Sequence, residues 1–172
     1  MNLWLRLWWI QWHASKKKPL GILEESVIRL PVILSDLDGY GHMNNSRYLS
    51  LMDLGRIDLM LRTGMGNTAK KNRWFPLVGS VHIQYRKSLH LFQIFELHTR
   101  ILGWDNQWFY LEQHFIRDGR EMARAAVRGL FRGVRGSVTP QTVLDTLGIR
   151  ETSPILSTEI NFKPKRKSDG IL

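Results

Sequence analysis

One segment in the first third of the chain brings together residue types that can do chemistry. Asp36 and Asp38 precede Gly41 and His42 by a few positions, and a helical pattern of apolar residues begins at Asn45. The first turn of a helix has backbone N–H groups that lack partners inside the helix and carry partial positive charge. An aspartate beside such donors can act on a carbonyl as a base or nucleophile while the amides hold the oxyanion. This combination favours cleavage of an acyl bond.

A purely structural role is the alternative for the same residues. Asp, Gly and Asn are common in turns, and Asn44 or Asn45 can cap a helix. A cap alone requires neither the paired aspartates nor His42, so the combination favours a site. Asp53, two helical turns beyond Asn45, can face the same cavity or form an ion pair with Arg56 at i, i+3 spacing. Both interpretations of Asp53 remain open.

Hot-dog-fold acyl thioesterases have an active-site segment that resembles the motif Asp36-x-Asp38-x-x-Gly41-His42-x-Asn44-Asn45-x-x-Tyr48, followed by an acid at Asp53. The most similar are the 4-hydroxybenzoyl-CoA thioesterase-like group and its relatives that act on acyl-carrier proteins. The motif departs from these patterns at three positions, the first being Met43, where many relatives have valine. Asp53 stands where many relatives have glutamate, and Tyr40 stands where the plant carrier-protein thioesterases have asparagine.

The resemblance implies a role for each residue of the site. Asp38 is the expected general base or nucleophile, backbone amides around Gly41 and His42 are the expected oxyanion hole, and Asp36 is a turn or hydrogen-bonding residue. His42 either assists the chemistry or serves as a hydrogen-bonding strut. The residues expected in catalysis are Asp38, His42, Gly41, Asn45 and Asp53. The residues expected to contact the acyl group or coenzyme A are Tyr48, Lys70, Lys71, Arg86 and Lys87.

The resemblance also implies an activity and partners. We expect hydrolysis of an acyl-CoA or acyl-carrier-protein thioester without a metal or a bound cofactor, coenzyme A entering only as part of the substrate. We expect a homodimer or homotetramer. The alternative function is a non-catalytic hot-dog protein that binds an acyl chain or lipid at a membrane surface.

Composition narrows the classes of function. The 172 residues suit one domain, and the absence of cysteine excludes disulfides, a cysteine nucleophile and thiolate metal sites. The six histidines are scattered without the spacing of metal ligands. The net charge of +10 fits anionic lipids, coenzyme A phosphates or an acidic carrier protein. Nucleic acid is disfavoured as a partner, because no binding motif accompanies the charge.

The N-terminal segment, residues 1–23, is rich in Trp and Leu. Trp4, Trp8, Trp9 and Trp12 are followed by a run of three lysines at 16–18. The apolar run is too short to span a bilayer, which requires roughly 20 residues. It suits a helix that lies on a membrane surface through Met1–Lys18, or one that packs against the fold or a partner. The corresponding expectation for location is the cytoplasm, with peripheral contact to the inner membrane surface.

The remaining pattern predicts the elements that position the motif. A helix over 45–63 is apolar nearly all round, so other structure must surround it. We expect a loop over 63–73, a type I′ hairpin turn at Asp118-Gly119, and a short helix over 139–147 with Thr139 as its N-cap. The expected strands cover 26–34, 75–85, 91–102, 107–116 and 121–134. This order is α+β, and with the resemblance it predicts a hot-dog fold over 24–138, in which a curved antiparallel sheet of five to six strands wraps around one long central helix. The remainder, 139–172, is expected to end as a basic tail.

Overall fold

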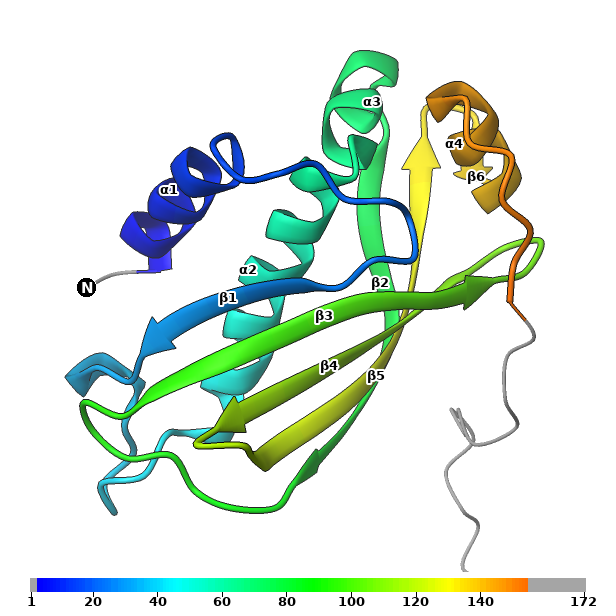
Figure 1. Cartoon of the computed structure of the whole chain (residues 1–172). Helices are drawn as coiled ribbons and strands as arrows, with labels where there is room; N and C mark the ends of the chain where they lie inside the picture. Colours follow the sequence, from blue (N-terminus) through cyan, green and yellow to red (C-terminus); the bar gives the residue numbers. More distant parts are fainter. Residues whose placement is uncertain (1–2, 155–172) are drawn as a thin grey trace, which may run out of the picture.

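One antiparallel sheet of six strands forms the frame of the protein in the computed structural model, which describes residues 3–154 (Figure 1). The strands are β1 (Ser26–Pro31), β2 (Phe75–Tyr85), β3 (Ile94–Trp104), β4 (Phe109–Arg117), β5 (Arg120–Gly133) and β6 (Gly136–Val138). Their order across the sheet is β1-β3-β4-β5-β2, and the short β6 pairs with β5. The predicted hot-dog architecture is confirmed.

The helix α2 (Asn45–Arg62) lies against the inner face of this sheet (Figure 1). Its Gly55 lies close against the sheet, because a Cβ there would come within 2.6 Å of the Thr99 Oγ1. The missing side chain therefore lets the helix backbone settle on β3 and β4. Glycine costs helix stability, but at this position it permits the packing.

Three further helices surround this core. α1 (Leu3–Ala14) packs against α2, and α4 (Pro140–Leu147) begins at the predicted Thr139 cap, whose side chain accepts the Thr142 amide. The prediction of a loop over 63–73 is wrong, because α3 (Met65–Asn72) occupies most of it. Met65 and Ala69 are buried at i, i+4 spacing, which stabilises this short helix through packing rather than through sequence propensity.

Most other elements agree with the sequence to within a few residues, apart from the end of β1 and the additional strand β6. The turn at Asp118 and Gly119 has positive φ at both residues, as a type I′ hairpin requires. β1 ends at Pro31 rather than at residue 34, because a 3₁₀ turn, η1 (Leu34–Asp36), follows it. The short β6 was not predicted. The basic run at 163–167 lies outside the described residues.

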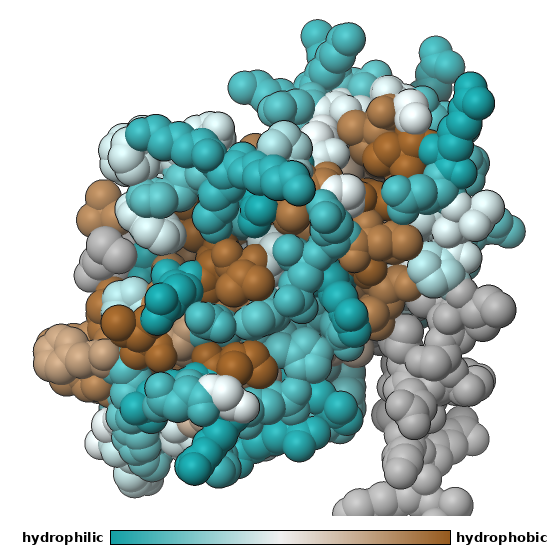
Figure 2. All heavy atoms as spheres, in the orientation of Figure 1, coloured by the Kyte–Doolittle hydropathy of each residue, from teal (hydrophilic) through white to brown (hydrophobic). Residues whose placement is uncertain are grey.

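The outer face of the sheet is mostly hydrophilic, as Figure 2 shows from that side. Along β5, Ala123, Ala125 and Val127 point into the core, whereas Arg124 and Arg128 alternate with them on the outer side. The alternation matches the two-residue period of a half-buried strand. The strand assignment of this arginine-rich segment is therefore confirmed.

Candidate functional site

The two aspartates of the motif have different environments. Asp36 is fully buried, and its carboxylate accepts hydrogen bonds from Arg6 Nη2 at 2.7 Å and Arg47 Nη2 at 2.9 Å. It also accepts the Ile33 amide at 3.1 Å. A carboxylate so fully paired inside the protein serves the structure. Asp36 joins α1, the turn after β1 and the start of α2.

Asp38 is only partly buried, and one of its carboxylate oxygens orders the loop. Asp38 Oδ1 accepts the Tyr40 amide at 2.9 Å and the His42 amide at 3.1 Å. Within residues 3–154, Asp38 Oδ2 has no hydrogen-bond partner. One oxygen therefore fixes the side chain while the other is available for chemistry.

The amides expected to form an oxyanion hole are already occupied in this loop. The Gly41 amide donates to the Asp38 carbonyl at 3.2 Å, and the His42 amide donates to the Asp38 carboxylate. The next two amides, of Met43 and Asn44, donate to backbone carbonyls. Among the described residues, Asn45 is the position of this run whose amide has no acceptor, because it stands at the first position of α2. The free donor therefore belongs to Asn45 rather than to Gly41 or His42.

A second histidine lies beside His42. His42 pairs with His90 through an isolated β-bridge, and the two imidazole rings meet edge to face with centroids 4.8 Å apart. The loop between β2 and β3 supplies His90, so the sequence alone gave no reason to join the two. On the same side, Tyr85 Oη donates to the Asn45 carbonyl at 3.1 Å. Tyr85 and His90 are thus neighbours of the motif that sequence reasoning missed.

Tyr48, which was expected to contact substrate, lies in the core of the single chain, and its contact with substrate stays a prediction. Its side chain is buried, and its ring packs edge to face against Tyr85 and Phe115. Burial raises the pKa of the Tyr48 hydroxyl to about 12. Tyr48 occupies the motif position because α2 needs an aromatic residue in the core there.

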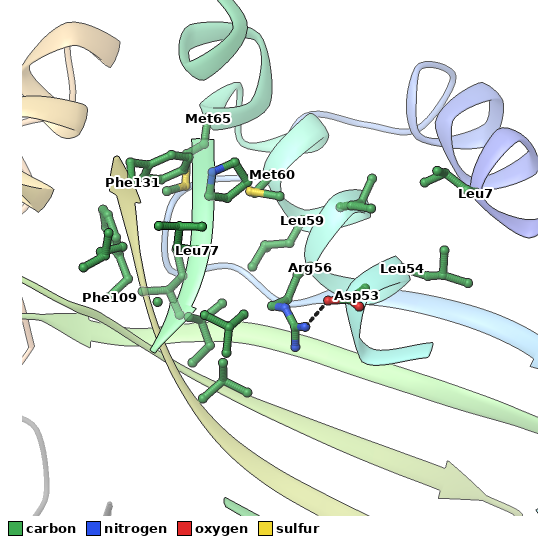
Figure 3. Close-up of a pocket in the computed structure, with 18 of the residues that line it drawn as sticks. Leu7, Asp53, Leu54, Arg56, Leu59, Met60, Met65, Leu77, Phe109 and Phe131 are labelled. Atoms are coloured by element: carbon green, nitrogen blue, oxygen red, sulfur yellow. Dashed lines mark hydrogen bonds and ion pairs between the residues drawn. The ribbon is translucent and has the colours of Figure 1, made fainter. Parts of the chain in front are cut away.

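A cavity of about 380 Å³ lies between α1, α2 and the sheet (Figure 3). Its walls are mainly Leu, Met, Phe and Val side chains, among them Leu59, Met60, Leu77, Phe109 and Phe131. Leu3, Trp4 and Leu7 of α1 complete one side. Neither Asp38 nor His42 belongs to the lining. Within a single chain, the cavity is therefore separate from the motif loop.

Asp53 and Arg56 supply the charges that border this cavity. They form the ion pair that their spacing allowed, drawn as a dashed line in Figure 3. Arg56 also donates to Gln113 Oε1 at 2.6 Å, and burial lowers the pKa of its guanidinium. Asp53 therefore forms the ion pair and also borders the cavity, and its expected part in catalysis stays a prediction.

A cationic hollow of about 300 Å³ lies where the β2–β3 loop meets the turn between β4 and β5. Lys87, Arg117 and Arg120 line it together with Asp118 and Met122. This is the end of the sheet at which the motif loop lies (Figure 1). The hollow can accept an anionic group, because three cations surround one carboxylate.

The other expected cations have different surroundings. Arg86 pairs with Glu121 at 2.7 Å. Lys70 and Lys71 are exposed on α3, at the opposite end of the sheet from the motif loop (Figure 1). Lys87 is therefore the expected cation that the structure places best. In the described part of the chain, no three His, Asp or Glu side chains are grouped as metal ligands.

The family model described as the thioesterase-like superfamily matches residues 32–155. The protein named THEM6 of Danio rerio is 35% identical over 158 residues, which are 91% of this chain and 77% of that protein. The thioesterase poxG of Penicillium oxalicum is 26% identical, with 70% of this chain and 52% of that protein covered. The solved structure of YbaW, a probable thioesterase from Escherichia coli, has a TM-score of 0.65 at 18% identity and covers 70% of this chain and 95% of that chain.

Proposed function

Because the chain belongs to the thioesterase-like superfamily, we propose that it hydrolyses an acyl thioester with Asp38 as the catalytic carboxylate. One observation carries the proposal. Asp38 holds one oxygen in place with two amides and keeps the other unpaired, in the loop that leads to the free Asn45 amide. Asp36, the alternative carboxylate of the motif, is fully buried between two arginines.

The proposed reaction needs one carboxylate and one donor. In the general-base route, Asp38 Oδ2 removes a proton from water as the water oxygen bonds to the thioester carbonyl carbon. The resulting oxyanion accepts the Asn45 amide. When the intermediate collapses, the carbon–sulfur bond breaks, and the thiolate takes the proton back from Asp38. In the nucleophilic route, the same oxygen attacks the carbonyl carbon, and the carbon–sulfur bond breaks to release the thiolate and leave an anhydride. Water then cleaves the anhydride, which frees the acid, restores the Asp38 carboxylate and supplies the proton that the thiolate takes up.

The acyl chain would occupy the cavity along α2. The lining begins at Ser50, five residues after Asn45, which corresponds to about 8 Å along the helix axis. Its walls suit an apolar chain, because few polar groups interrupt them. The test is hydrolysis by the purified protein across acyl-CoA thioesters of increasing chain length and aromatic analogues. If the purified protein hydrolyses none of these thioesters, the proposal is contradicted.

The cationic hollow favours coenzyme A as the carrier of the acyl group. Lys87 and Arg120 can bind phosphate there by charge-assisted hydrogen bonds. We predict that Lys87→Ala and Arg120→Ala each raise KM for acyl-CoA about tenfold, the loss of roughly 1.4 kcal/mol of binding. KM for the same acyl group on pantetheine, which lacks the nucleotide phosphates, should stay unchanged.

The matched controls for this prediction are Lys70→Ala and Lys71→Ala. These exposed lysines lie at the other end of the sheet, so KM for acyl-CoA should match the wild type. Equal effects at both ends would indicate general electrostatic attraction. A KM change on acyl-pantetheine would point instead to a disturbed active site.

The free edge of β2 supports a homodimer. Among the described residues this strand pairs only with β5, and its eleven residues expose Phe75, Leu77 and Val78. An exposed apolar edge is a template for another strand. We propose that a second copy pairs here antiparallel and covers the side of the cavity formed by Pro76, Leu77 and Val78.

Val78→Lys should therefore convert the protein from a dimer to a monomer in sedimentation analysis at micromolar concentration. A lysine on each of two facing edges places like charges together, which destabilises strand pairing. Val134→Lys is the matched control, because Val134 is more exposed but lies in the β5–β6 turn. A wild-type monomer, or a Val78→Lys dimer, would contradict the proposed interface.

The separation of the cavity from Asp38 supports a second candidate function. A protein that only binds an acyl chain requires the cavity and has no need for the motif loop. In that case, acyl-CoA incubated with the protein for hours would be recovered intact and bound. Mass spectrometry of the released ligand distinguishes this outcome from hydrolysis.

A further inference from the structure

The outer face of α1 is apolar, whereas its inner face carries a buried charge. The inward positions include Arg6, Ile10 and Ala14, all buried. The outward side chains are Trp4, Leu5, Trp8, Trp9 and Trp12, which we call the tryptophan face. Trp4 is 73% exposed and Trp8 is 67% exposed. A helix on the surface of a soluble domain normally has the opposite polarity.

Buried contacts fix which way this helix faces. Arg6 donates to Asp36 at 2.7 Å and to the Pro31 carbonyl at 2.8 Å. Beyond the helix, Lys17 donates to the Val27 carbonyl at 3.2 Å and lies 3.5 Å from Asp58. Rotation of α1 to hide the tryptophans would pull the Arg6 charge away from Asp36, its one carboxylate partner within residues 3–154. The domain thus holds the tryptophan face outward.

The cations beside the tryptophan face indicate what covers it. Lys16 Nζ lies 3.5 Å from the centroid of the Trp12 ring, and Lys18 is also exposed. Tryptophan prefers the headgroup level of a bilayer, and adjacent lysines attract anionic lipids. Among residues 3–154, no helix is long and apolar enough to cross a bilayer. We propose that the tryptophan face docks α1 in the plane of an anionic lipid surface.

This docking has a consequence for the apolar cavity. Trp4 belongs to the tryptophan face and also lines the cavity, next to Leu3 and Leu7. In this proposal the mouth of the cavity lies beside Trp4, so that it opens at the bilayer surface when α1 lies on lipid. An acyl chain could then enter from the membrane without crossing water, a step that rests on the proposed function. The docking itself does not depend on hydrolysis.

Vesicle binding by the full chain tests the docking. The wild type should sediment with vesicles of phosphatidylcholine and phosphatidylglycerol, and should bind much less to phosphatidylcholine alone. The double variant Trp8→Ser/Trp12→Ser should reduce binding at least about tenfold, since it removes two interfacial anchors outside the cavity lining. Val134→Ser removes an exposed apolar side chain elsewhere and should bind as the wild type does.

Two results would overturn the docking. One is a wild type that stays unbound with anionic vesicles. The other is a double variant that binds as well as the wild type. Binding to protein-containing native membranes but not to protein-free vesicles would assign the tryptophan face to a protein partner instead. Because no substrate is present, a lack of thioesterase activity would leave these results unaffected.

Quenching by brominated lipids tests where the cavity mouth lies. The variant Trp8→Phe/Trp9→Phe/Trp12→Phe keeps Trp4 as the only tryptophan of α1, and the addition of Trp4→Phe removes it. The triple variant should lose more fluorescence on brominated anionic vesicles than the quadruple variant. Equal quenching would show that Trp4, and with it the mouth, faces away from the lipid.

Discussion

Asp38→Asn is expected to lower kcat for acyl-CoA hydrolysis by about 10²–10⁴, the usual contribution of a positioned general base. The amide has nearly the same shape as the carboxylate, and its oxygen can still accept the Tyr40 and His42 amides. Loop geometry should therefore survive while the basic oxygen is lost. Steady-state kinetics on the best thioester of the chain-length series measures the effect.

Thermal unfolding provides the control for Asp38→Asn. The variant should unfold within a few degrees of the wild type, because Asp38 is partly exposed and makes no ion pair among the described residues. Full activity in this variant would remove Asp38 from the mechanism. Hydroxylamine distinguishes the two possible roles of Asp38. Only the nucleophilic route forms an anhydride, and hydroxylamine traps that anhydride.

Asp36→Asn should mainly lower the stability of the fold, whereas Asp38→Asn should mainly lower kcat. Removal of one partner from a buried ion pair typically costs about 3–5 kcal/mol, because the remaining charge stays buried without compensation. Arg6 is fully buried, and its carboxylate partner among the described residues is Asp36. We therefore expect a large fall in the free energy of unfolding, measured by urea denaturation, that affects Asp36→Asn and spares Asp38→Asn.

A conservative partner variant strengthens this assignment. Arg47→Lys retains a positive charge near Asp36, and Arg47 is partly exposed, so its cost should be smaller. If Asp36→Asn were as stable as the wild type but inactive, the roles of the two aspartates would be exchanged. Asp36→Asn and Asp38→Asn together thus distinguish a structural aspartate from a catalytic one, which the sequence alone could not do.

The sequence predicted the parts of the fold that periodicity encodes. The all-round apolar helix, the period-two strands and the Asp118–Gly119 turn are local signals, and all three are confirmed. α3 was not predicted because its one glycine and two asparagines are typical of a loop, although Met65 and Ala69 are buried at helical spacing. β6 was not predicted because its three residues are too few to show the alternation of a strand.

The site was harder to predict than the fold, because its partners come from distant segments. Nothing in the sequence joins His42 to His90, or Asp36 to Arg6, until the chain is folded. Tyr48 matches the motif, but its ring is buried in the core. Free and occupied amides also cannot be distinguished without the loop conformation, in which the Gly41 and His42 amides have acceptors and, among the described residues, the Asn45 amide has none.

The Arg6–Asp36 contact determines how α1 can be studied. Truncation of the first turns would leave a buried carboxylate with Arg47 as its remaining cation, directly before the Asp38 loop. A shortened protein would therefore lose stability whether or not α1 ever meets lipid. Point substitutions on the outward tryptophans avoid this confusion, because they leave the internal anchor intact.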